Sequence, residues 1–199
     1  MQDSGYRDRL GQLVEPGERL LAYAKAEAAH GAQPAAAPDA TAPQGSVRVT
    51  AGGVLLNLLA PVVTFGPGDR LVDRVCWGVA GRGAAGSVAA RLHRALHPPR
   101  SPGTVRDTLI AATDQRLLVC LTGAVKLFAW RADDERSLAG TRVVFAAART
   151  EVAAARVGWH RLNPKRLRVD FTDGSWLAFT VPIAESGRPL REVAAALSR

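Results

Sequence analysis

Two histidines are the first residues whose spacing could do chemistry. His93 lies in a segment, Ser87–Leu96, whose pattern predicts a helix, and His97 directly follows it four residues later, so both imidazoles would face the same side. Zinc sites use such a pair. A third ligand would have to come from Cys76, Asp73 or a distant carboxylate, and no second ligand cluster is visible in the sequence. We therefore expect no metal and no other cofactor, and we expect both histidines to be solvated or interfacial.

The motifs of phosphate binding and hydrolysis are also missing from the sequence. Four glycines between residues 78 and 86 could let backbone amides approach an anion, but their spacing fits neither the P-loop nor the dinucleotide fingerprint. The alternative is that these glycines form a flexible turn or allow a helix to pack closely. The chain contains no GxSxG sequence, and the run Asp133-Asp134-Glu135 indicates a solvated polar turn. We therefore predict that the protein is not an enzyme.

The predicted helix Ser87–Leu96 is also the first candidate contact surface. Its apolar stripe and its outward arginines, next to the apolar run Val54–Phe65, are typical of a basic amphipathic helix at a membrane interface. The alternative is a helix packed on the rest of the fold with its arginines in water. The residues expected to contact a membrane or partner are Arg82, Leu92, Arg91, Arg94, Arg100, Leu58, Leu59 and Phe65.

A second basic patch surrounds the loop from Trp159 to Lys165. It comprises Arg156, Arg161, Lys165 and Arg166, with His160 and Arg168 beside them. Arginine next to tryptophan can hold phosphate and stack on planar groups. A solvated, exposed turn is the alternative.

Charge and length limit the classes of function. The 199 residues include 26 basic and 18 acidic ones, for a formal net charge of +8, which permits an anionic partner without requiring one. The two basic patches are interrupted by Asp69, Asp73, Asp170 and Asp173, so nucleic-acid binding is not expected. Val54–Phe65 is too short to cross a bilayer.

Two cysteines and a polar N-terminus favour the reducing cytoplasm, with the protein peripheral at the inner membrane if it binds lipid. Cys76 and Cys120 are expected to be buried free thiols.

The elements that position these residues follow from periodicity. We predict an N-terminal helical segment at residues 1–16 and a linker rich in alanine and proline at residues 31–46. Residues 47–103 are expected to form an apolar and basic insertion. Alternating apolar residues predict seven strands, at residues 105–113, 116–121, 125–130, 142–147, 152–159, 167–172 and 176–181. Residues 19–28 predict an eighth strand, although their alanines also allow a helix. Asp173-Gly174 predicts a tight hairpin turn, and the stripe of Leu190, Val193 and Leu197 predicts a closing helix.

Several of these segments together carry a resemblance. The strand after Pro16-Gly17-Glu18, the run Ala111–Val119, the hairpin containing Phe171–Ser175 and the closing helix resemble the bacterial pleckstrin-homology-like (PH-like) domains. The resemblance implies a mainly β (α+β) fold, a bent antiparallel barrel of about seven strands capped by a C-terminal helix. It covers residues 17–30 and 104–199, so one of the eight predicted strands is expected to be wrong. Residues 47–103 depart from the family, which usually has a short loop there.

These observations favour a non-catalytic interaction module that docks on a partner protein or the cytoplasmic membrane surface through the insertion. One alternative is that the insertion completes the fold or forms a homodimer interface, without lipid affinity. A weaker alternative is an enzyme with its site where the barrel meets the insertion, using His93, His97 or Cys76.

Overall fold

The computed structural model describes residues 3–29, 79–97, 103–126, 131–161, 163–181 and 186–198. The predicted linker, the predicted contact residues Leu58, Leu59, Phe65 and Arg100, and Cys76 lie outside the described residues.

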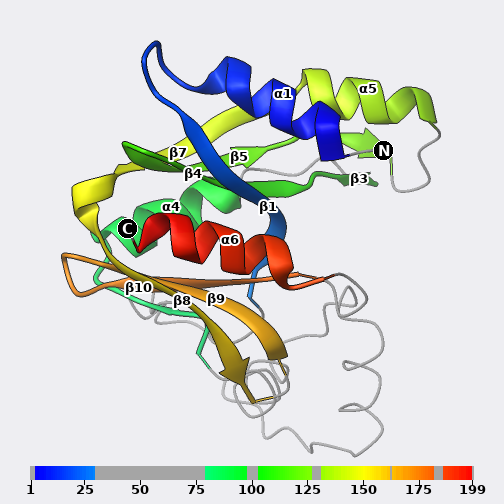
Figure 1. Cartoon of the computed structure of the whole chain (residues 1–199). Helices are drawn as coiled ribbons and strands as arrows, with labels where there is room; N and C mark the ends of the chain where they lie inside the picture. Colours follow the sequence, from blue (N-terminus) through cyan, green and yellow to red (C-terminus); the bar gives the residue numbers. More distant parts are fainter. Residues whose placement is uncertain are drawn as a thin grey trace, which may run out of the picture.

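The described part of the chain is built on one antiparallel sheet (Figure 1). Seven strands follow one another in the order β7-β5-β4-β1-β10-β9-β8, and the short β2 pairs with β10. A separate two-stranded ribbon joins β3 and β6. The strands are β1 (Leu20–Ala28), β2 (Gly81–Arg82), β3 (Thr104–Val105), β4 (Thr108–Thr113), β5 (Arg116–Leu121), β6 (Val125–Lys126), β7 (Arg142–Ala148), β8 (Val152–His160), β9 (Asn163–Phe171) and β10 (Trp176–Thr180).

Strand β1 joins two halves of the sheet. Its residues Leu20 to Ala26 pair with β4, whereas Glu27 and Ala28 pair with β10. We call β1, β4, β5 and β7 the first half-sheet, and β10, β9 and β8 with β2 the second half-sheet. The sheet is open, since within the described residues β7 pairs only with β5 and β8 only with β9.

Two helices fill the space between the half-sheets. Helix α6 (Arg188–Leu197) packs on β1, β4, β8 and β9, and Figure 1 shows it between the two halves. Helix α4 (Val88–Leu96) packs on β7, β10 and β2. Both insert their apolar stripes into the largest cluster of buried side chains, which all the main strands share. Burying such stripes is what holds short amphipathic helices in place.

The position of α4 corrects two expectations. The helix itself is confirmed, but Leu92, expected to contact a membrane or partner, is completely buried in the core. The apolar face of α4 is therefore already used inside the protein. Residues 79–97 of the predicted insertion also belong to this fold, because β2 pairs with β10 and α4 packs in the shared core. Arg91 and Arg94 lie on the exposed face of the helix.

A second layer covers the outer face of the first half-sheet. Helix α1 (Asp3–Leu13), which confirms the predicted N-terminal helix, packs Leu10 on Leu109, Leu118 and Cys120. Cys120 is a buried free thiol, as predicted, and burial raises the pKa of this thiol to about 11.

Helix α5 (Arg131–Ala139) lies beside α1 and was not predicted. Its first turns contain the acidic run 133–135, so the expected polar turn is wrong. Arg9 donates hydrogen bonds from Nη2 to the carbonyl oxygens of Ala139 and Thr141, which satisfies acceptors at the end of this helix. Gly123 and Gly140 allow the close approach there, because a Cβ on Gly140 would lie 2.7 Å from the Gly123 Cα.

The mainly β prediction is thus confirmed, with an antiparallel sheet and a C-terminal helix. Each of the eight predicted spans contains a strand, although the span 125–130 contributes only the two-residue β6 within the described residues. None of the helices in the described ranges is long and apolar enough to cross a membrane.

Candidate functional site

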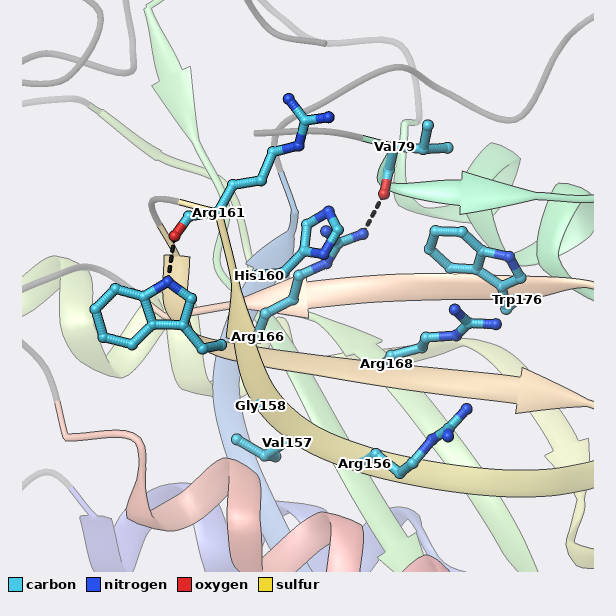
Figure 2. Close-up of a pocket in the computed structure, with 10 residues that line it drawn as sticks. Val79, Arg156, Val157, Gly158, His160, Arg161, Arg166, Arg168 and Trp176 are labelled. Atoms are coloured by element: carbon cyan, nitrogen blue, oxygen red, sulfur yellow. Dashed lines mark hydrogen bonds between the residues drawn. The ribbon is translucent and has the colours of Figure 1, made fainter. Parts of the chain in front are cut away.

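An open pocket of about 480 Å³ lies on the outer face of the second half-sheet (Figure 2). Strand β9 explains its composition, because Leu167 and Val169 point into the core while Arg166 and Arg168 point outward. We call it the arginine pocket. The residues that line it are Val79, Arg156, Val157, Gly158, Trp159, His160, Arg161, Arg166, Arg168 and Trp176.

Strand register brings these residues together from three strands. Arg168 lies opposite Arg156 of β8, and Asp170 lies opposite Trp176 of β10. Residues directly opposite each other share a face of the sheet, so all four side chains emerge on the outer surface. Arg82 of β2 lies opposite Trp176 in the same way, which places this predicted contact residue beside the pocket.

Two arginines converge on one carboxylate. Arg156 donates from Nη2 to Asp170 Oδ2 at 2.9 Å, and Arg168 donates from Nε to Asp170 Oδ1 at 2.7 Å. Burial alone would raise the pKa of Asp170, but the hydrogen bonds from Arg168 and Arg156 outweigh it and lower this pKa. The carboxylate is therefore ionised near neutral pH and holds both guanidinium groups in position.

Trp176 orders the other side of the pocket. The Arg168 guanidinium lies 4.2 Å from the centre of its ring, and that of Arg166 lies 5.6 Å away, so both make cation–π contacts. Arg166 is only 6% exposed and donates a hydrogen bond to the Val79 carbonyl oxygen, as Figure 2 shows. Burial, and then Arg168, lower the pKa of Arg166 to about 10, which still leaves it charged.

The tip of the β8–β9 hairpin forms one end of the pocket. Trp159 is 76% exposed, and its indole N–H donates to the carbonyl oxygen of Arg161, which has a φ of 54°. Desolvation lowers the pKa of His160, with further lowering by Arg166, Arg161 and Arg168. His160 is therefore mainly neutral at pH 7, and the positive charge here belongs to the arginines.

The structure brings together most of the predicted second patch. Arg156, Arg161 and Arg166 line the pocket, whereas Lys165 does not and instead lies near Gly187, before α6. Sequence reasoning missed Trp176, although it follows the Asp173-Gly174 turn at an outward position of the alternating pattern.

His93 and His97 lie close together at the end of α4, and Asp73 and Cys76, named above as possible third ligands, lie outside the described residues. The rings of His93 and His97 are 4.4 Å apart, and His97 Nδ1 lies 2.8 Å from the His93 carbonyl oxygen. Burial, and then the neighbouring His97, lower the pKa of His93. The described part of the chain contains no group of three or more His, Cys, Asp or Glu that could hold a metal ion.

The start of α4, which follows the glycine-rich stretch, is already occupied by side chains. The Val88 and Ala89 amides donate to Asp173 Oδ2 at 2.8 Å and to Ser175 Oγ at 3.1 Å. The Ala90 amide donates to Ser87 Oγ at 3.2 Å. These caps use the amides that a phosphate at a helix start would need.

The chain was compared with protein-family models, curated proteins and solved structures, and none of the three comparisons finds a match.

Proposed function

We propose that this protein is a non-catalytic interaction module with a PH-like fold that docks on an anionic surface through the arginine pocket. Two features support the PH-like part of the proposal. Seven main strands form one antiparallel path in which β1 links the two half-sheets, and a C-terminal helix packs between them.

The observation that carries the docking proposal is the difference between the two outer faces. The face of the first half-sheet is covered by α1, with α5 beside it. Within the described residues, the outer face of the second half-sheet instead carries an open pocket lined by four arginines. Clustered guanidinium groups attract anions and match the planar geometry of carboxylate and phosphate.

This proposal moves the docking surface away from α4, where the sequence had placed it. The apolar stripe of α4, made of Val88, Ala89, Leu92 and Leu96, is buried, and its exposed Arg91 is 3.6 Å from Glu151. The exposed charges of α4 therefore provide a matched comparison for those of the pocket.

The experiment measures binding to two anionic probes, phosphatidylglycerol vesicles and poly-aspartate, at low and high salt, with phosphatidylcholine vesicles as the neutral control. The double variant Arg156→Gln/Arg168→Gln is compared with Arg91→Gln/Arg94→Gln, so each protein loses two positive charges. We expect salt-sensitive binding that the first variant loses and the second retains. Loss in the α4 variant instead, or no binding of either probe by the intact protein, would contradict the proposal.

A further inference from the structure

The contacts of Asp170 show an anion geometry that the two pocket arginines match. Arg156 and Arg168 come from different strands, yet their donors meet at the two oxygens of Asp170. Two guanidinium groups aimed at one planar anion form a preorganised arrangement, since their orientation does not have to be found on binding.

Both arginines keep part of their surface for a ligand. The side chain of Arg156 is 68% exposed and that of Arg168 is 42% exposed, whereas Asp170 between them is only 18% exposed. An anion arriving from solvent therefore meets the outward N–H groups while Asp170 keeps its hydrogen bonds. Trp176 lies under the Arg168 guanidinium and restrains its plane.

The charge of an anion decides how strongly Arg156 and Arg168 attract it. Asp170 offsets only one of the positive charges, so a singly charged carboxylate or phosphodiester is still attracted, but less strongly than a doubly charged anion. A phosphate monoester carries a charge of about −2 near pH 7 and three acceptor oxygens, which roughly doubles its attraction to the same arginines.

The pocket also has room and apolar surface for more than the phosphate. Its volume of about 480 Å³ lies within the range of small-molecule sites, and Val79 and Trp176 contribute to its lining. A ligand with a hydrophobic or ring-containing group next to its phosphate fits this combination.

We propose that the arginine pocket binds a phosphate monoester, with Arg156 and Arg168 holding the phosphate and Trp176 forming the wall beside it. This inference rests on the proposed function, because it names the ligand class for the same docking surface. The phosphate can belong to a soluble ester or to a lipid headgroup, and the experiment below separates these two sources.

The soluble test titrates the full chain with phenyl phosphate and with methyl phenyl phosphate, which differ by one negative charge. Isothermal titration calorimetry at constant ionic strength should show the monoester binding about tenfold more tightly or better. Arg168→Gln and Arg156→Gln should each weaken this binding about tenfold, while Arg94→Gln leaves it unchanged. If Arg168→Gln perturbs the sheet, Arg156→Gln still tests the proposal, because the Arg156 side chain is strongly exposed.

The membrane test compares vesicles containing phosphatidic acid, a monoester, with vesicles of phosphatidylglycerol, a diester, at matched charge density. A preference for phosphatidic acid assigns the ligand to a lipid, and phenyl phosphate binding without that preference assigns it to a soluble ester. Equal binding of monoester and diester in both tests overturns the monoester inference but leaves the proposed function standing. No binding of any anion overturns both.

Discussion

Arg116 holds the carboxylate of Glu18 with two hydrogen bonds, from Nη2 to Oε2 at 2.5 Å and from Nε to Oε1 at 3.1 Å. Thr113 donates to the same carboxylate through Oγ1, and the Glu15 amide donates to Oε2 at 3.0 Å. The Glu18 side chain is only 1% exposed. This pair ties the turn before β1 to the corner between β4 and β5.

Replacing Glu18 with Gln should destabilise the fold substantially. The substitution leaves the Arg116 guanidinium, which is 23% exposed, without its charged partner. Breaking a buried ion pair from one side costs roughly 3 kcal/mol or more, so urea unfolding should show a loss of this size. Glu15→Gln is the control, because Glu15 contacts the same arginine but its side chain is 68% exposed. The control should lose less than about 1 kcal/mol, and equal losses would contradict the assignment.

The same carboxylate should make stability depend on pH. The hydrogen bond from Arg116 outweighs burial and, with the smaller contributions of Thr113 and Glu15, lowers the pKa of Glu18 from 4.5 to about 2. Because the pKa is lower in the folded state, this stabilisation is complete above pH 4.5 and is lost as the pH falls toward 2.

The difference in unfolding free energy between the wild type and Glu18→Gln should therefore shrink on acidification. From about 3 kcal/mol at pH 7, we expect less than about 2 kcal/mol at pH 3. The lowered pKa values of Asp170 and Asp173 act in both proteins and cancel in the difference. A constant difference across this pH range would show that Glu18 is not ionised through this pair.

Strands and amphipathic helices were predictable because their signals are local. The alternation of Leu167 and Val169 with Arg166 and Arg168 marks β9 without any knowledge of its neighbours. Helix α5 was missed because the segment 131–139 has no apolar stripe. Its position depends on distant partners such as Arg9, which a local pattern does not show.

The site was predictable only in part, for the same reason. The cluster of basic residues around Trp159 is visible in the sequence. Its geometry depends on the pairing of β8 with β9 and of β9 with β10, which places Arg156, Arg168 and Trp176 together. The role of Leu92 could not be settled from its helix, because an apolar stripe fits a membrane and a protein core equally well.

Ser175→Ala should loosen α4 selectively. Ser175 Oγ accepts the Ala89 amide hydrogen bond at 3.1 Å, so the substitution removes one of the caps at the start of the helix. Loss of a cap costs about 1 kcal/mol. Hydrogen exchange should become faster in residues 88–96. Ser186→Ala is the matched control, since Ser186 Oγ accepts the Arg188 amide at the start of α6. This assignment would be contradicted if hydrogen exchange in α4 became faster in the control, or if it did not become faster in Ser175→Ala.

Gly83→Ala tests how closely the glycine-rich segment packs on the start of α4. A Cβ at position 83 would lie 2.2 Å from Ser87 Oγ and 2.9 Å from Ser175 Cβ, and real side chains do not come this close. The backbone or the capping serines must therefore shift, and we expect a loss of about 1 to 3 kcal/mol in urea unfolding. Gly86→Ala makes the same change three residues later, where an added Cβ meets nothing within 4 Å. That control should stay within about 0.5 kcal/mol of wild type. If both variants unfold alike, the loss at position 83 comes from chain flexibility and not from packing against Ser87 and Ser175.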